Sequence, residues 1–196
     1  MKLIYILLLF LFTPVLNALD SNDKSSNQFK GPSVYELDST WINQNGVNVN
    51  LEELKGKPYI VTMAFTGCRY SCPLIIEELK RIDRKFTAKQ RAQYGIIFFS
   101  IDPTNDTPSV LRAYAKKSGI DLNRWIFMTS NDETVRDLAA AVGFKYKKDA
   151  KMGFSHSNLI TVLDRNGSIN FQQKAINQNR TDIINALKKL LAKKKN

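Results

Sequence analysis

The sequence contains few residues that bind metal ions through sulfur or imidazole. Its 196 residues include only two cysteines and one histidine. A structural zinc site normally takes four protein ligands, so this set is one ligand short of such a site. The chain also has no proline after Pro108, no internal repeat and no sign of a second domain. The two cysteines and the histidine are therefore the strongest candidates for chemistry in a single domain.

The sequence also lacks an apolar run long enough to span a membrane. Leu3–Leu16 is apolar at all but two positions, but a spanning helix needs about 20 such residues. With Lys2 in front, the run has the charged start and apolar core of a signal peptide. We expect export to the periplasm, with the domain either released or anchored to the inner membrane by this segment. The predicted organisation is a signal peptide or N-terminal anchor over residues 1–18, a flexible linker over residues 19–30 and one folded domain over residues 31–196.

The chain has an excess of positive charge without a nucleic-acid-binding motif. Lys and Arg number 29 against 18 Asp and Glu, which gives a net charge of +11. The excess is spread along the chain, apart from a cluster of lysines near the C-terminal end. This pattern favours a solvated surface, with the last lysines complementing the end of a helix. Attraction to an acidic partner or to an acidic membrane surface stays open, and we expect no nucleic-acid partner.

Apolar runs of strand length alternate with helical patterns along the domain. Three continuous runs predict buried strands: Tyr59–Phe65, Gly95–Ile101 and Trp125–Met128. Apolar spacing, capping residues and glycines predict helices after them: Leu74–Phe86, Thr107 to Gly119, and Ser130 to Gly143.

Both ends of the domain carry hairpin signals. Asn45-Gly46 predicts a turn between short strands at Val34–Leu37 and Val47–Val49. A second hairpin and a final helix are predicted from strands Asn158–Leu163 and Ser168–Phe171, their turn Asp164–Gly167, and the helix Arg180–Lys194. This order predicts an α/β fold of the thioredoxin-like type, with a central mixed sheet, helices on both faces and an N-terminal β-hairpin extension.

Both cysteines lie in the turn between the first buried strand and the helix that follows it. Cys68 is on the loop, and Cys72 directly precedes Pro73, a residue favoured at the first helical position. Cys72 should therefore lie near a helix cap, where unpaired N–H groups favour a thiolate. Arg69 should make both thiols easier to deprotonate. Two thiolates this close can form a disulfide or share a soft metal ion.

The fold brings a third ligand to the same edge of the sheet. Ligands gather beyond the carboxyl ends of parallel strands. If Asn158–Leu163 runs antiparallel to the strand before Cys68, its beginning lies at that edge, and His156 stands two residues before it. Two thiolates and an imidazole suit copper and also zinc. The missing fourth ligand favours one copper ion, as Cu(I) or Cu(II), held by Cys68, Cys72 and His156.

At this point the sequence resembles the Sco/SenC family of copper chaperones, from about Gly31 to about Phe171. The resemblance is carried by the Cys-x-x-x-Cys-Pro loop, by Ser100–Pro108, which is similar to the family's Asp-Pro-x-x-Asp-Thr segment, and by His156-Ser157 ahead of a strand and an Asp-x-x-Gly turn. It implies a thioredoxin-like domain that binds one copper ion through the two cysteines and this histidine. It also implies a role in assembling the dinuclear copper centre of cytochrome c oxidase, with subunit II as the client. The protein would donate copper, reduce the target cysteines, or do both.

Two positions depart from the family pattern. The family usually has an acidic residue between its cysteines, where this chain has Tyr70, and another just before the histidine, where it has Ser155. Their replacement should change hydrogen bonding around the metal and the docking of the partner. For Asp102, Asp106 and Thr107 we expect turn and cap roles, with Asp102 as a candidate to orient a ligand.

Two other interpretations of the cysteine pair remain. A structural disulfide is inefficient, because closing so short a loop removes little entropy from the unfolded chain. A periplasmic thiol–disulfide oxidoreductase acting through Cys68 and Cys72 is the leading alternative. Thioredoxin-type enzymes, however, use Cys-x-x-Cys and keep a cis-proline before the strand assigned here to Asn158–Leu163, where this chain has none. The leading hypothesis is a metallochaperone rather than an enzyme, and thiol exchange with one dedicated partner is compatible with it.

Overall fold

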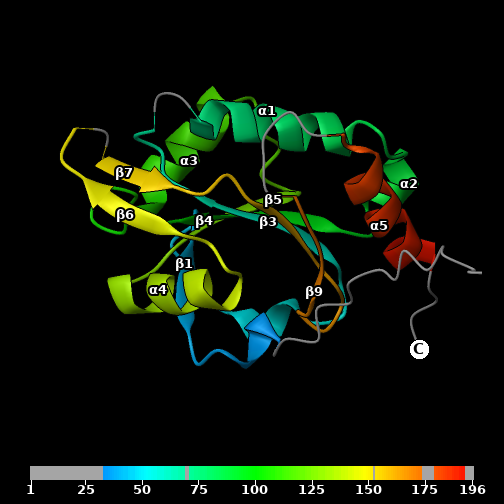
Figure 1. Cartoon of the computed structure of the whole chain (residues 1–196), viewed down its shortest axis with the longest axis horizontal. Coiled ribbons are helices and arrows are strands. Elements are labelled where there is room, and N and C mark those ends of the chain that lie inside the picture. Colours follow the sequence, from blue (N-terminus) through cyan, green and yellow to red (C-terminus); the bar gives the residue numbers. More distant parts are fainter. Residues whose placement is uncertain (1–32, 69–70, 152, 174–178, 193–196) are drawn as a thin grey trace, which may run out of the picture.

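The computed structural model describes residues 33–68, 71–151, 153–173 and 179–192. Its centre is a seven-stranded sheet with the order β2-β1-β5-β4-β3-β8-β9. Helices cover both faces, with α1, α3 and α5 on one side and α4 on the other (Figure 1). The predicted fold class, a thioredoxin-like mixed sheet between helices, is confirmed. The strands of the sheet are β1 Thr40–Asn43, β2 Asn48–Asn50, β3 Tyr59–Ala64, β4 Gly95–Ser100, β5 Trp125–Thr129, β8 Ile160–Leu163 and β9 Ile169–Gln173.

Strand β3 occupies the middle of the core and leads directly to the cysteines. All six of its residues are buried, as expected for a strand covered on both faces. It pairs in parallel with β4 and antiparallel with β8, where Thr62 is opposite Ile160. The start of β8 therefore lies at the same edge as the end of β3. This antiparallel pairing is the one that the sequence argument required to bring His156 close to Cys68.

The N-terminal hairpin exists, but its first strand is not the one predicted. Residues Val34–Glu36 form a 3-10 helix, η1, in which Ser33 accepts a hydrogen bond from the backbone N–H of Tyr35. Val34 and Tyr35 are both buried, whereas an edge strand buries alternate residues. The strand that pairs with β2 is β1, which joins the sheet beside β5. The prediction of a strand at Val34–Leu37 is therefore wrong.

A further hairpin, absent from the sequence prediction, stands apart from the main sheet. Strands β6 (Tyr146–Asp149) and β7 (Gly153–His156) form a separate two-stranded sheet, with Tyr146 opposite His156. In Figure 1 this hairpin lies beside the N-terminal end of α1. It packs on the body through aromatic side chains, since the ring of Phe154 lies edge-on to Phe65 at 5.2 Å. This hairpin carries the single histidine of the chain.

The helices follow their predicted order with shifted ends. The longer ones are α1 Ser71–Asp83, α3 Pro108–Lys117, α4 Asp132–Ala141 and α5 Thr181–Ala192, and a short helix, α2 Ala88–Arg91, and a 3-10 turn, η2 Leu51–Leu54, were not predicted. Asn131, rather than Ser130, caps α4 by accepting a hydrogen bond from Thr134. Within the described ranges, no helix has the length and apolar character needed to cross a membrane. The segments predicted as signal peptide or anchor (1–18) and as linker (19–30) lie outside the described residues.

Candidate metal centre

The two cysteines stand at the junction of β3 and α1, and the helix itself holds them together. The backbone N–H of Cys72, in the first turn of α1, donates to the Sγ atom of Cys68 at 3.4 Å. The sulfur of Cys68 therefore takes the role of a cap at the N-terminus of this helix. Cys68 is half-buried and Cys72 has no exposed surface, and both are thiols in this structure. One sulfur is thus accessible from outside and the other is enclosed.

Burial sets the acidity of the inner thiol. It is the main cause that raises the pKa of Cys72, the nearby Cys68 adds to the effect, and a hydrogen bond with the backbone of Phe65 opposes it. The expectation of a Cys72 thiolate at the helix end is therefore wrong for the metal-free protein, because burial disfavours the charged thiolate. Arg69 and Tyr70 lie outside the described residues.

His156, at the end of β7, points one ring nitrogen at the cysteines. Its Nδ1 atom lies 2.8 Å from the carbonyl oxygen of Ser157, which can only accept, so Nδ1 carries the proton. In the neutral ring the Nε2 atom then has a free lone pair, and it lies 3.8 Å from the Sγ atom of Cys72. The ring stacks on Phe144 at 5.9 Å and meets the edge of Phe65 at the same distance. A protonated Nδ1 bonded to a carbonyl is the usual arrangement for a histidine that ligates a metal through Nε2.

The structure thus brings together the three predicted residues Cys68, Cys72 and His156. One potential ligand atom from each lies within 4.8 Å of the other two. Ligands at bonding distances of about 2.0 to 2.3 Å from one ion are roughly 4 Å apart, so a small inward shift completes a three-ligand site. Two sulfurs and an imidazole are soft donors that match copper. The donor set and the His156 tautomer therefore fit a bound copper ion.

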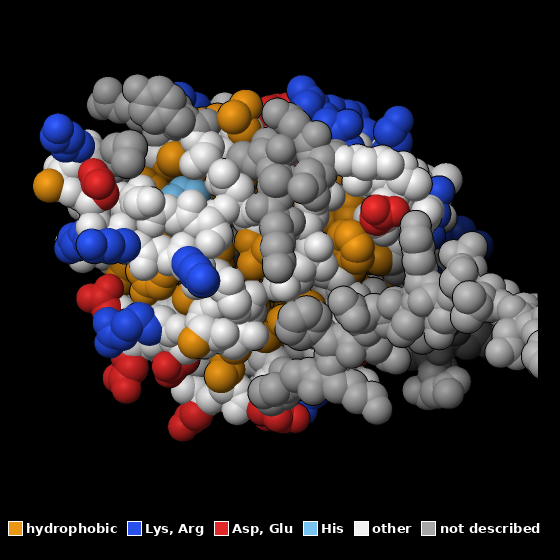
Figure 2. All heavy atoms as spheres, viewed as in Figure 1, with side chains coloured by type: hydrophobic (Ala, Val, Ile, Leu, Met, Phe, Trp, Pro, Cys, Tyr) orange, Lys and Arg blue, Asp and Glu red, His pale blue; other side chains and the backbone are white. Residues whose placement is uncertain are grey.

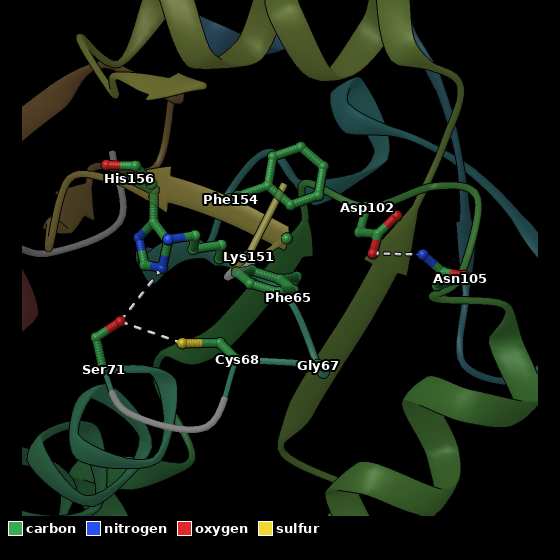
Figure 3. A pocket seen from close by; sticks show the side chains of 11 residues that line it. Phe65, Gly67, Cys68, Ser71, Asp102, Asn105, Lys151, Phe154 and His156 are labelled. Atoms are coloured by element: carbon green, nitrogen blue, oxygen red, sulfur yellow. Dashed lines mark hydrogen bonds between the residues drawn. The ribbon is translucent and has the colours of Figure 1, made fainter. Parts of the chain in front are cut away.

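Ser71, the first residue of α1, lies between two of these groups. Its Oγ atom is 3.3 Å from the Sγ atom of Cys68 and 3.3 Å from Nε2 of His156, as the dashed lines in Figure 3 show. A cavity of about 980 Å³ opens beside these residues and is lined in addition by Phe65, Phe154, Ser155 and Lys151. The histidine is visible from outside as a small recessed area in Figure 2. The site is therefore reachable from the surface through Cys68, Ser71 and His156.

A buried carboxylate holds the loop that carries Cys68. Asp106 has no exposed surface, and it accepts hydrogen bonds from the backbone N–H of Thr66 at 3.0 Å, from the Thr66 hydroxyl at 2.5 Å and from the Ser100 hydroxyl at 2.5 Å. Burial raises its pKa, and the bonds from Ser100 and Thr66 partly offset that rise. Asp106 is thus an anchor between the ends of β3 and β4 rather than a turn residue.

Its neighbours have the simpler roles predicted for them. Thr107 caps α3 by accepting from the backbone N–H of Val110. The Asp102 carboxylate accepts from the side-chain amide of Asn105 at 2.8 Å. Figure 3 places Asp102 across the cavity from His156. In this arrangement Asp102 belongs to the cavity wall.

Sequence reasoning missed the contributions of Ser71, Phe65 and Asp106. The sequence predicts Phe65 only as the last residue of a buried strand, yet its ring contacts both His156 and Phe154. The signal for Asp106 was present, because a second acid four residues after Asp102 follows a buried strand that ends next to the cysteine loop. Ser71 had no sequence signal of its own beyond its place inside the Cys-x-x-x-Cys loop.

Comparison with known proteins points to one family. Residues 29–192 match the SCO1/SenC family model. The SCO1 protein homolog of Bacillus subtilis is 34% identical over 119 residues, which cover 60% of this chain and 61% of that protein. The solved structure of BsSco, a member of the Sco family of cytochrome c oxidase assembly proteins with a disulfide switch, superposes with a TM-score of 0.70 at 26% identity, covering 80% of this chain and 92% of that one.

A further likeness supports the fold. Bradyrhizobium japonicum ScoI with copper bound superposes with a TM-score of 0.66 at 24% identity, over 82% of this chain and 98% of that one. Against the curated relatives the match is shorter, because the aligned region spans only about three fifths of their length.

Proposed function

This chain belongs to the SCO1/SenC family, and we propose that it is a copper chaperone that holds one copper ion, as Cu(I) or Cu(II), through Cys68, Cys72 and His156. The single observation that carries the proposal is the convergence of three soft ligand atoms within 4.8 Å of one another, drawn from separate elements of the fold. The copper bound to the related ScoI of Bradyrhizobium japonicum supports the choice of ion.

The client that we propose is the dinuclear copper site of cytochrome c oxidase subunit II. The related BsSco belongs to a family of cytochrome c oxidase assembly proteins, which supports this assignment. Transfer would proceed by ligand exchange. An incoming thiolate from the client reaches the ion through the cavity, on the side of half-buried Cys68 and His156. The protons lost from the two thiols on loading return as the sulfurs give up the ion. The enclosed Cys72 would be the last ligand to release the copper ion.

The same role agrees with a domain on the periplasmic side of the inner membrane. We propose that residues 1–18 direct export, or remain as an anchor, and that the basic surface associates with the membrane. The chain has 29 basic and 18 acidic residues, and this excess of positive charge supports attraction to an anionic surface.

The deciding experiment is a copper titration of the reduced protein and of His156→Ala, with affinity measured by competition against a chromogenic copper chelator. We expect one ion per chain and at least about tenfold weaker binding in the variant, because one of three ligands is lost. Lys148→Ala, an exposed change on the same hairpin, should bind copper like the parent protein. Equal affinity in His156→Ala would remove the imidazole from the site.

A second function is favoured by the unequal exposure of the two thiols. We propose as the alternative a thiol–disulfide exchange in which the Cys68 thiolate attacks a disulfide of the client and forms a mixed disulfide. Cys72, losing its proton, then attacks the Cys68 sulfur and releases the client dithiol. Two electrons and two protons pass to the client, and a Cys68–Cys72 disulfide remains. Rapid reduction of insulin disulfides by a protein that takes up no copper would favour this function over the first.

A further inference from the structure

Ser71 is the one hydroxyl in the described residues with contacts to two of the proposed ligands. Its Oγ atom lies 3.3 Å from both the Cys68 sulfur and Nε2 of His156 (Figure 3). It is half-buried at the start of α1 and lines the cavity beside the site. The metal centre as described above does not use this hydroxyl.

The donors and acceptors around Ser71 can be assigned in the metal-free protein. In the neutral imidazole of His156, Nδ1 donates to the carbonyl of Ser157, so Nε2 has no proton and accepts. A serine hydroxyl has a single proton, which it therefore donates to Nε2. The contact with Cys68 then has the thiol S–H as donor and the Ser71 oxygen as acceptor. The three groups form one directed chain from Cys68 through Ser71 to His156.

These two hydrogen bonds cannot both persist once copper is bound. The inference rests on the proposed function. The lone pair of Nε2 is then used by the ion, and Cys68 has lost its proton. Of the two neighbours of Ser71, only the Cys68 sulfur is then an acceptor. We propose that the Ser71 hydroxyl turns from His156 to Cys68 on loading and so becomes a hydrogen-bond donor to the copper-bound sulfur.

The hydrogen bond from Ser71 to the copper-bound sulfur favours the reduced ion, Cu(I). Two thiolates, one imidazole and Cu(I) carry a net charge of −1, whereas the same ligands with Cu(II) are neutral. An O–H donor stabilises the more negative sulfur, and hydrogen bonding at a ligating cysteine is a known means of tuning a copper site. The backbone N–H of Cys72, 3.4 Å from the same sulfur, acts in the same direction. Ser71 is thus a positioning residue that shifts the balance toward Cu(I).

The test compares Ser71→Ala with Ser71→Thr in the full-length protein loaded with copper. We expect Ser71→Ala to lower the Cu(II)/Cu(I) midpoint potential and to move the sulfur-to-Cu(II) charge-transfer absorption to lower energy. Ser71→Thr keeps the hydroxyl and should restore both toward the parent values. Ser109→Ala, which removes an exposed hydroxyl on α3 that does not line this cavity, is the matched control and should change neither.

The hydrogen bond from Ser71 to His156 in the metal-free protein is tested separately, by the ¹⁵N resonance of Nε2 in His156. Ser71→Ala removes the donor to this nitrogen, so its resonance should move downfield, and Ser71→Thr should keep it in place. An unchanged resonance would contradict the Ser71–His156 bond whether or not copper binds. A parent protein that takes up no copper would contradict the proposed function. A loaded parent protein with the same potential as Ser71→Ala would contradict this inference alone.

Discussion

The Nε2 atom of His156 lies 3.8 Å from the Sγ atom of Cys72, although the two residues are 84 positions apart in the sequence. Cys72 lies in the first turn of α1 and His156 ends β7. The two meet only because β8 pairs antiparallel with β3 and brings the preceding hairpin back to the cysteine loop. Metal affinity should therefore be lost together with the tertiary structure, since the unfolded chain does not hold these atoms close.

Copper affinity should rise with pH. Burial raises the pKa of Cys72, so this thiol is protonated at neutral pH and must release its proton when the ion binds. Each proton displaced makes the apparent affinity about tenfold higher per pH unit, as long as the pH is below the pKa of that thiol. Competition titrations between pH 6 and pH 8 measure this slope. A pH-independent affinity would show that Cys72 is already a thiolate before loading.

The two thiols should react with iodoacetamide at different rates. Cys68 is half-buried, whereas Cys72 has no exposed surface and a raised pKa, so alkylation of Cys68 should be at least about tenfold faster. Mass spectrometry of Cys68→Ser and Cys72→Ser, each with one thiol left, gives the two rates. In guanidinium chloride the rates should converge, because the difference comes from the fold. A faster reaction at Cys72 in the folded protein would contradict the assignment of the enclosed sulfur.

Asp106→Ala should loosen the cysteine loop as well as destabilise the domain. It leaves the Thr66 backbone N–H and the Ser100 hydroxyl without their acceptor, at a cost of about 2 to 4 kcal/mol in the free energy of unfolding. Copper affinity should fall too, since Thr66 stands two residues before Cys68. Chemical denaturation and copper competition measure the two effects.

The matched control for this change is Asp137→Ala, on the exposed face of α4, which should alter neither quantity by more than about 0.5 kcal/mol. Asp106→Asn keeps an acceptor oxygen and should fall between Asp106→Ala and the parent. A fully stable Asp106→Ala would mean that the loop is held by other contacts.

The ion pair of Asp83 and Arg124 should support the fold at neutral pH and fail in acid. Burial acts to raise the pKa of Asp83, but the hydrogen bonds of 2.7 and 2.8 Å from Arg124 and the bond from Tyr94 outweigh it, and the pKa is lowered from its ordinary value of 3.8. A lowered pKa gives stability that is present above pH 3.8 and is lost as the pH falls through the lower, folded-state value. This carboxylate therefore contributes to the loss of stability in acid.

Arg124→Gln should cost about 2 to 3 kcal/mol at pH 7, less than a fully buried pair, because a quarter of the Arg124 side chain is exposed. The difference from the parent should shrink below pH 3.8. Urea denaturation at pH 7 and pH 3 measures it. The exposed pair of Lys55 and Glu52 is the control, and Lys55→Gln should change stability by less than about 1 kcal/mol. An equal loss for both substitutions would show that burial of Asp83 has no part in the effect.

The elements that could be predicted from the sequence are those whose burial follows a simple period. Strands β3, β4 and β5 are continuous apolar runs, and α3 begins at a Thr-Pro cap, so their positions agree with the structure to within a few residues. The meeting of Cys68, Cys72 and His156 could also be predicted, because it follows from strand direction alone. These features depend on local sequence and on the general rules of sheet topology.

The hairpin of β6 and β7 could not be predicted in the same way, because none of the described residues of its two strands is fully buried. Its residues are exposed or half-buried, so no apolar alternation marks the strands. What stabilises it is the pairing of the two strands, the contact of Tyr146 and Phe154 with each other, and the packing of Phe154 on Phe65. The polar partners Ser71 and Asp106 were missed for a related reason, since a hydrogen bond across the fold leaves no periodic trace in a sequence.

The hairpin that carries His156 is hydrogen-bonded as a sheet of its own, whereas the two sulfurs belong to the loop after β3 and to the first turn of α1. The imidazole can therefore separate from the sulfurs without breaking any ladder of the main sheet. A molecule that binds the displaced hairpin more tightly weakens the hold on copper, and by thermodynamic reciprocity copper weakens the binding of that molecule by the same factor. The binding of that molecule to the hairpin and the release of copper would then be linked by one coupling free energy.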